Sequence, residues 1–152
     1  MDLYLVRHGE AEAAGVGGDE ARELTDKGMR DSRAVAEAVA RAGAKLEAIW
    51  TSPLVRARQT AEIIGRVLGV TAHSDERLRP GATLGGVQDL LGDRADPQVM
   101  LVGHEPDMSA LVYQLTGGRV KMRTSGVARI DAERIEPGAA VLVWLVSAEV
   151  VG

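Results

Sequence analysis

Short apolar runs that end in polar clusters are the feature that most constrains how this chain can fold. Residues 3–6, 47–51 and 98–102 are runs of this kind. An apolar run of about four to eight residues that ends at polar or turn residues is typical of a strand buried on both faces. The chain is therefore predicted to place several strands side by side in its core, with polar residues following each strand.

Four stretches with apolar residues at helical spacing separate or follow these runs. The first has Thr25 as its N-cap and stops at Gly43. The second opens with Ser52-Pro53, expected to act as cap and first-turn proline, and stops at Gly69. Shorter helices are predicted around 84–91 and after Pro106. The residues expected on the inward faces of the two long helices are Met29, Ser32, Val35, Ala36, Val39 and Ala40, and then Ala57, Ala61, Ile64 and Leu68.

Three further strands complete the predicted sheet: a weak one near 70–73 and two late ones near 126–130 and 141–146. Strands that alternate with helices of about 10 to 15 residues indicate a mostly parallel sheet covered by helices on both faces. We therefore expect an α/β fold, with a single three-layer α/β/α domain over residues 1–152. Ligands of such sheets bind beyond the carboxyl ends of the strands, where the polar clusters lie.

The composition excludes several classes of protein and of site. Hydrophobic residues make up 45% of the 152 residues, which is typical of a globular protein. The formal net charge is −4 and Lys and Arg form no run, so we expect no nucleic-acid partner. The absence of cysteine excludes a disulfide framework and a cysteine nucleophile. No apolar run has the length of a membrane span and no secretory signal is apparent, so we expect a cytoplasmic protein without a membrane partner.

Two of the polar clusters carry a histidine, and arginines accompany them. Arg7-His8 follows the first apolar run, Arg56 lies in the helix after the second, and Gly103-His104 follows the third. These side chains are expected to share one rim of the sheet. Guanidinium groups pair with phosphate oxygens, and their charge disfavours protonation of a neighbouring imidazole. The pattern indicates a site in which a neutral imidazole attacks a phosphate dianion.

Three segments, in this order, resemble the signatures of the histidine phosphatase superfamily: Leu5-Val6-Arg7-His8-Gly9-Glu10-Ala11, Thr51-Ser52-Pro53-Leu54-Val55-Arg56-Ala57-Arg58-Gln59-Thr60-Ala61-Glu62 and Leu101-Val102-Gly103-His104-Glu105-Pro106. The resemblance implies a phosphoglycerate-mutase-like fold. It implies that His8 takes the phosphoryl group, that Arg7 and Arg56 clamp its oxygens, and that His104 completes the pocket. Arg22 resembles a further phosphate-binding arginine of the short members, although Glu23 stands where proline is usual.

The chain between Thr60 and His104 leaves little room for the helical insertion that roofs the site of the mutases. The resemblance therefore narrows to the SixA type, whose members remove phosphate from phosphohistidine on proteins such as the phosphotransfer domains of signalling kinases. It implies a phosphatase with an open site, a covalent phosphohistidine on the enzyme and no cofactor. Glu76 and Glu105 are the candidate proton donors.

Two other functions stay open on the sequence: a phosphatase for small phosphomonoesters, and a non-catalytic module that binds a phosphorylated partner. Ordinary explanations suffice for the other chemically active side chains. His73, Arg58 and Arg66 are expected on the surface, and Ser52 and Ser125 are expected to cap a helix and pack a strand. The three histidines are far apart in sequence and have no carboxylate pair at ligand spacing, so we expect no metal site.

Overall fold

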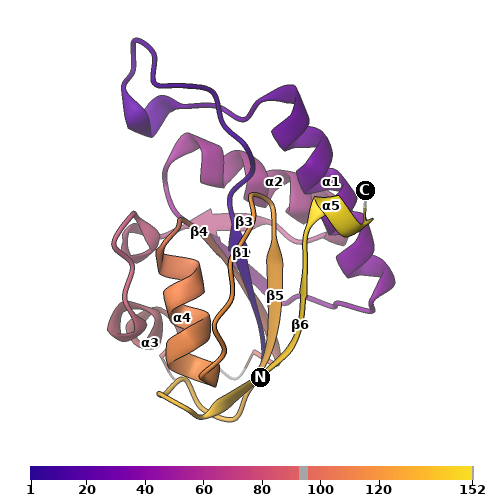
Figure 1. Cartoon of the computed structure of the whole chain (residues 1–152), viewed down its shortest axis with the longest axis vertical. Helices are drawn as coiled ribbons and strands as arrows, with labels where there is room; N and C mark the ends of the chain where they lie inside the picture. Colours follow the sequence, from indigo (N-terminus) through magenta and orange to yellow (C-terminus); the bar gives the residue numbers. More distant parts are fainter. Residues whose placement is uncertain (93–95, 152) are drawn as a thin grey trace.

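A six-stranded sheet forms the centre of the part of the chain that the computed structural model describes, residues 1–92 and 96–151 (Figure 1). The strand order is β3-β2-β4-β1-β5-β6. The first four strands pair in parallel, and β5 and β6 are added antiparallel at one edge. The strands are β1 (Asp2–Arg7), β2 (Ala48–Thr51), β3 (Ala72–Ser74), β4 (Gln98–Gly103), β5 (Val127–Ala132) and β6 (Ala140–Val146). The sheet is mostly parallel, as predicted.

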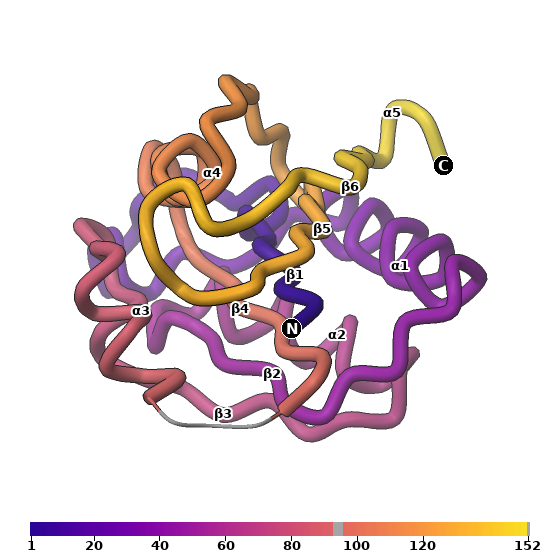
Figure 2. Tube along the Cα trace, turned by 90° about the horizontal axis from the view of Figure 1, so that it is seen from below, coloured from indigo at the N-terminus to yellow at the C-terminus, as the bar shows by residue number. Residues whose placement is uncertain are grey.

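Helices cover both faces of the sheet. In the described residues they are α1 (Asp26–Arg41), α2 (Val55–Leu68), α3 (Leu84–Leu91), α4 (Asp107–Thr116) and α5 (Ala148–Val151), with short 3-10 helices η1 (Asp19–Ala21) and η2 (Glu76–Leu78). Helices α1 and α2 pack on one face and α3 and α4 on the other, so Figure 2 shows the strands between two pairs of helices. This is the predicted α/β/α layering. None of these helices is both long and apolar enough to cross a membrane.

The central strand β1 is apolar throughout because both of its faces are buried. Leu3 and Leu5 point into the core beneath α3 and α4, and Tyr4 and Val6 point into the core beneath α1 and α2. Successive side chains of a strand alternate between its faces, so a strand covered on both sides has a continuous apolar run. Each large side chain buried in this way contributes roughly 1.5 to 3 kcal/mol of hydrophobic free energy.

Helix α1 begins at the predicted cap. Thr25 Oγ1 accepts a hydrogen bond from the backbone N–H of Gly28 at 2.9 Å. Met29 and Ala40 are exposed, contrary to the prediction for the inward face. Gly28 takes an inward place instead, because the helix passes so close to the backbone of Glu10 that no β-carbon fits between them.

Two other local predictions differ from the structure. Ser52 and Pro53 precede α2 instead of starting it, and Ser52 Oγ accepts a hydrogen bond from the Leu54 N–H at 3.2 Å. Strand β3 begins at Ala72, later than predicted, because the N–H of Val70 still bonds to Gly65 and closes the end of α2.

The strand register brings the polar clusters to one end of the sheet. Arg7 pairs with Gly103 and Thr51 pairs with Val102, so β1, β2 and β4 end at nearly the same level. The residues that follow these three strands therefore leave the sheet together. The segment that contains η1 rises above this end of the molecule (Figure 1).

The close approach of α1 to the Glu10 backbone can be tested by comparing two helical glycines. Gly28→Ala is expected to lower the free energy of unfolding by about 1 to 3 kcal/mol, because a β-carbon there would lie 2.2 Å from the Glu10 carbonyl oxygen. Gly85→Ala in α3 is the control, since its β-carbon would meet nothing closer than 3.9 Å. It is expected to be neutral or slightly stabilising. Urea unfolding followed by circular dichroism measures the free energy of unfolding of each variant. Equal changes in Gly28→Ala and Gly85→Ala would contradict the close packing of α1 on Glu10.

Candidate active site

His8 follows β1 directly, and its two ring nitrogens have different partners. Nδ1 lies 2.8 Å from the carbonyl oxygen of Gly9, and Nε2 lies 3.3 Å from Nε of Arg56. A carbonyl oxygen only accepts hydrogen bonds, so the ring proton belongs on Nδ1. Nε2 then carries the lone pair and accepts a hydrogen bond from Arg56. This tautomer leaves the nitrogen beside Arg56 unprotonated, so it can act as a nucleophile once Arg56 turns its hydrogen bond to a ligand.

Backbone and hydroxyl contacts fix the loop that carries His8. The His8 N–H donates to the carbonyl oxygen of Gly103 at 3.0 Å. The N–H of Gly9 donates to Thr60 Oγ1 at 3.0 Å, and the Thr60 hydroxyl donates to the carbonyl oxygen of Arg56 at 2.8 Å. The ends of β1 and β4 and the first two turns of α2 are therefore tied together around His8. Thr60, which the sequence analysis assigned no role, makes the link to α2.

Two guanidinium groups accompany the imidazole. Arg56 lies in the first turn of α2, and its side chain is only 7% exposed. Its Nη1 donates to the carbonyl oxygen of Asp19 at 2.8 Å, and its Nη2 donates to the carboxylate of the same residue at 3.2 Å. Arg7 donates through Nη1 to the carbonyl oxygen of Met122 at 3.0 Å, and its Nε is buried without a hydrogen-bond partner in the described part of the chain.

His104 lies beside His8, with the two ring centroids 5.1 Å apart. Its Nε2 is 2.8 Å from Ser52 Oγ, and that oxygen already accepts a hydrogen bond from the Leu54 N–H. The Ser52 hydroxyl proton has no other acceptor in the described residues, and its donation to His104 Nε2 places the ring proton on Nδ1. This Nδ1 is buried, and no residue of the ranges 1–92 and 96–151 hydrogen-bonds to it. The arrangement supplies an unused N–H donor next to His8.

Burial is the main reason that both site histidines are neutral. It lowers the pKa of His8 from 6.5 to about 4, and the charges of Arg56, Arg7 and Arg22 act in the same direction. Burial likewise lowers the pKa of His104 to about 4, with smaller contributions from His8 and Arg56. The sequence predicted a neutral imidazole from the guanidinium charges. The direction of that prediction is confirmed, but desolvation is the larger cause.

Asp19 is a residue of this site that the sequence analysis missed. Its Oδ2 accepts the hydrogen bond from Arg56, and its Oδ1 accepts another from Nη1 of Arg22 at 3.0 Å. Arg22 also donates through Nε to the carbonyl oxygen of Glu12 at 2.7 Å. The structure thus brings Arg22 to the same group of charges as His8 and Arg56. The i,i+3 spacing of Asp19 and Arg22 is the only signal in the sequence, and such pairs are common on protein surfaces.

The two carboxylates predicted as candidate proton donors have other partners. Glu105 accepts hydrogen bonds from the N–H of Ser109 at 2.8 Å and from its hydroxyl at 2.6 Å, which caps the start of α4. Glu76 is 75% exposed and pairs with Arg79. Within the described residues, neither carboxylate is hydrogen-bonded or ion-paired to any of the four core residues of the site, Arg7, His8, Arg56 and His104.

The two serines also differ from their predicted roles. Ser52 holds His104 instead of capping α2 by its side chain. Ser125 lies in a turn before β5 with φ 59°, and its Oγ is 2.9 Å from that of Ser32. A β-carbon on Gly9 would lie 2.9 Å from both of these oxygens, so only glycine fits beside them. The predicted surface residues, His73, Arg58 and Arg66, are exposed.

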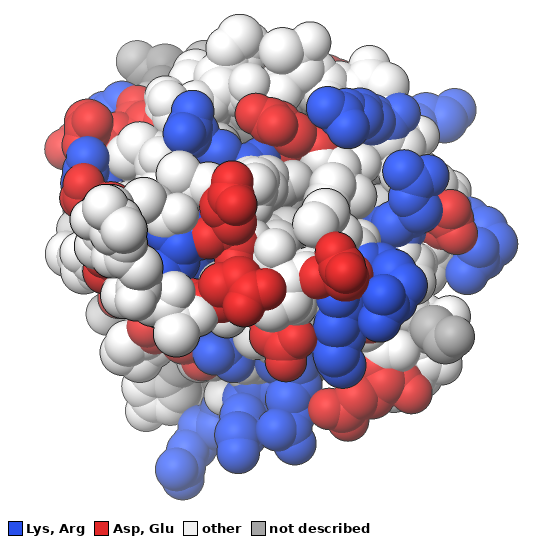
Figure 3. Space-filling model, turned by 90° about the horizontal axis from the view of Figure 1, so that it is seen from above, with Lys and Arg blue, Asp and Glu red and all other residues white. Residues whose placement is uncertain are grey.

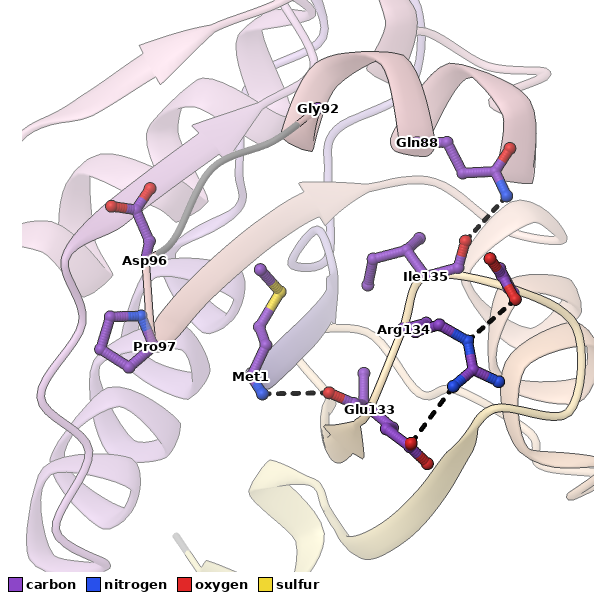
Figure 4. A pocket seen from close by; sticks show the side chains of 10 residues that line it. Met1, Gln88, Gly92, Asp96, Pro97, Glu133, Arg134 and Ile135 are labelled. Carbon is purple, nitrogen blue, oxygen red and sulfur yellow. Dashed lines mark hydrogen bonds and ion pairs between the residues drawn. The ribbon is translucent and has the colours of Figure 1, made fainter.

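A hollow of about 710 Å³ lies at the opposite end of the molecule, beside Met1 (Figure 4). Gln88 donates a hydrogen bond to the carbonyl oxygen of Ile135 there, and Arg134 pairs with two glutamates. This hollow has no histidine among its lining residues. In residues 1–92 and 96–151, no group of three or more His, Asp or Glu side chains could hold a metal ion.

A neutral imidazole whose unprotonated nitrogen accepts a hydrogen bond from Arg56, set among guanidinium groups, suits one class of ligand. Several cationic donors on one side require an anion with several acceptor oxygens, and arginine pairs in a bidentate manner with phosphate. The lone pair of His8 is then able to attack phosphorus and carry the phosphoryl group. The fold and the site together are those of an α/β protein of the phosphoryl-transfer class.

Comparison with known proteins identifies the family. A model of the histidine phosphatase superfamily (branch 1) matches residues 3–81. An uncharacterized protein of Picosynechococcus sp. is 36% identical over 147 residues, which cover 90% of this chain and 89% of the relative. Phosphohistidine phosphatase SixA of Escherichia coli (strain K12) is 28% identical over 154 residues, which cover 97% of this chain and 94% of the relative.

A solved structure of the protein histidine phosphatase SixA complexed with tungstate agrees with this result. Its TM-score with this structure is 0.88, at 27% sequence identity and with 97% of each chain covered. The chain therefore belongs to the histidine phosphatase superfamily, as its motifs indicated. Within that superfamily it is similar to SixA in sequence and fold, and it is a hydrolase of the phosphatase class.

The lowered pKa values of the two site histidines can be measured by titrating their ring resonances by NMR. Both are expected to titrate near pH 4 in the folded protein and near 6.5 in urea-unfolded protein. Between these values the unfolded chain binds the additional protons, so stability is expected to fall as the pH decreases from about 6.5 to about 4. Titration of both rings near pH 6.5 in the folded state would contradict the buried, neutral site.

The role of Ser52 in orienting His104 generates a second prediction. Ser52→Ala removes the hydroxyl that places the His104 proton on Nδ1, so affinity for tungstate should fall roughly fivefold, the equivalent of about 1 kcal/mol. Nitrogen NMR should show a mixture of His104 tautomers in this variant. Ser74→Ala, at an exposed position in β3, is the control and should bind like the unchanged protein. A single Nδ1–H tautomer in Ser52→Ala would contradict the assignment.

Proposed function

We propose that this protein hydrolyses phosphohistidine on a phosphorylated partner protein, with His8 as the nucleophile. The observation that carries the proposal is the state of the His8 ring. Gly9 holds the proton on Nδ1, burial keeps the ring neutral, and the Nε2 lone pair lies beside Arg56. The similarity to SixA of Escherichia coli, a phosphohistidine phosphatase, supports the same activity here.

The reaction consists of two displacements at phosphorus. Nε2 of His8 forms a P–N bond as the P–N bond to the substrate imidazole breaks, and that imidazole leaves. Water then forms a P–O bond and loses a proton to solvent as the bond to Nε2 breaks, which releases inorganic phosphate and restores the neutral ring. Arg7, Arg22, Arg56 and the N–H of His104 Nδ1 hold the charged oxygens during both steps. The chain's own side chains supply every group in this scheme, without a cofactor.

The carboxylates around the site favour a substrate with a good leaving group. Glu105 and Glu76 are bound to Ser109 and Arg79. The hydrogen bond from Arg22 lowers the pKa of Asp19, so this carboxyl has no proton to give near neutral pH. A phosphohistidine whose second ring nitrogen is protonated releases a neutral imidazole, and no acid has to protonate the leaving atom. An alkyl phosphate would need such an acid.

The elements around the site also favour a large substrate. Between α2 and β4 the described residues form only β3, η2 and α3. Helix α3 packs into the core beside the sheet through Val87, Leu90 and Leu91, so it does not cover the strand ends. Within the described part of the segment between α2 and β4, no helix therefore lies over His8. An imidazole that projects from the surface of another protein is the phosphorylated group that such a site is suited to accept.

Replacing His8 by alanine is expected to abolish both hydrolysis and formation of the phosphorylated enzyme while the fold is retained. Arg56→Ala should lower kcat/KM by about 10- to 100-fold, because charge-assisted hydrogen bonds to the phosphate are lost. Arg58→Ala, an exposed arginine of the same helix, is the matched control and should retain normal kinetics. The assay is release of labelled phosphate from a phosphotransfer domain that carries phosphohistidine. A His8→Ala variant with a normal rate would refute the proposal.

The substrate class can be determined with the same preparations and a panel of phosphorylated compounds. The proposal predicts a higher kcat/KM for the phosphohistidine protein than for sugar phosphates or aryl phosphates, because Glu76, Glu105 and Asp19 are not placed or protonated to give a proton to their oxygen leaving groups. Faster hydrolysis of the small esters would instead identify a phosphomonoesterase. Binding of the phosphorylated protein without any phosphorylated enzyme in a single turnover would identify a non-catalytic module.

A further inference from the structure

The carboxylate of Asp19 accepts hydrogen bonds from arginines that bind phosphate in the proposed function. Asp19 Oδ2 is 3.2 Å from Nη2 of Arg56, and Oδ1 is 3.0 Å from Nη1 of Arg22. The backbone oxygen of Asp19 accepts a further hydrogen bond from Nη1 of Arg56 at 2.8 Å. One residue therefore places three acceptor oxygens on two of the proposed phosphate-binding arginines, as a phosphate group would.

The position of Asp19 makes this carboxylate displaceable. Its side chain is 59% exposed, whereas the Arg56 side chain beneath it is 7% exposed. The segment 12–21, which carries it, is exposed at every residue and contains Gly15, Gly17 and Gly18. This segment rises above the carboxyl ends of the strands in Figure 1, and Figure 3 shows acidic and basic side chains mixed on this end of the molecule. The carboxylate thus covers the buried guanidinium of Arg56 from the solvent side.

We infer that Asp19 is a specificity-determining residue, an internal anion that competes with the substrate's phosphate for Arg56 and Arg22. This inference rests on the proposed function. An incoming phosphate must either displace the carboxylate or bind beside it against like-charge repulsion, and both lower the affinity for phosphate. The hydrogen bond from Arg22 lowers the pKa of Asp19, so the carboxylate is charged near neutral pH.

The consequence differs for small and large ligands. Free inorganic phosphate gains its affinity only from the groups of the pocket, so the competing carboxylate weakens its binding and speeds its release. A phosphorylated protein also makes contacts outside the pocket, and these contacts help to displace the exposed segment 12–21. Asp19 therefore favours protein-bound phosphate over free phosphate and small phosphate esters.

The test compares Asp19→Asn with Glu20→Gln. Both variants remove one negative charge from η1, but the Glu20 carboxylate pairs with Arg79 and not with Arg56. Calorimetry with tungstate should show roughly tenfold tighter binding to Asp19→Asn and unchanged binding to Glu20→Gln. Inorganic phosphate should inhibit Asp19→Asn at about tenfold lower concentration, and the preference for the phosphohistidine protein over an aryl phosphate should decrease.

The outcomes separate this inference from the proposed function. Tungstate affinity that is unchanged or weaker in Asp19→Asn, with hydrolysis intact in the unchanged protein, would overturn the competition and leave the proposed function standing. Equal gains in Asp19→Asn and Glu20→Gln would overturn it as well, because the effect would then be one of general charge. Failure of the unchanged protein to bind tungstate or to hydrolyse phosphohistidine would overturn the proposed function and this inference together.

Discussion

The hydrogen bond between His8 Nδ1 and the carbonyl oxygen of Gly9 determines what the rest of the site can do. It holds the proton on one nitrogen and leaves the lone pair on the other, next to Arg56. Desolvation keeps the ring uncharged, and this allows an imidazole to lie among several guanidinium groups without electrostatic penalty. The arginines then carry positive charge that only an anion can balance. In the structure this anion is Asp19, and during the proposed reaction it is the phosphoryl group.

Much of the fold follows from hydrophobic patterning. Strand β1 is apolar because both faces are covered, and Thr25 caps α1 as its side chain predicts. The helix predicted over 84–91 has the same limits in the structure. The residues whose burial was predicted wrongly are those whose surroundings depend on contacts between distant segments of the chain. Met29 is exposed and Gly28 buried because the Glu10 backbone lies against α1, and no local sequence pattern reports that approach.

The site was predictable to the extent that its residues lie in recognisable motifs. The structure brings His8, Arg56 and His104 into one group, as the order of the strands and the resemblance to the superfamily indicated. The roles of Asp19 and Ser52 were not predicted from the sequence, because these roles depend on the atoms that the two side chains contact in the folded protein. An aspartate in a glycine-rich loop and a serine before a helix have ordinary explanations. Only three-dimensional contacts show that one occupies two arginines and the other orients a histidine.

The central claim is that the Nε2 lone pair of His8 carries the phosphoryl group. The most direct measurement is NMR of the phosphorylated enzyme, trapped in base after rapid mixing with a phosphohistidine donor, with nitrogen labels in the histidine rings. The account predicts a single phosphoryl group, bonded to Nε2 of His8. A phosphoryl group on Nδ1, on another residue, or on none while substrate is being hydrolysed would contradict it.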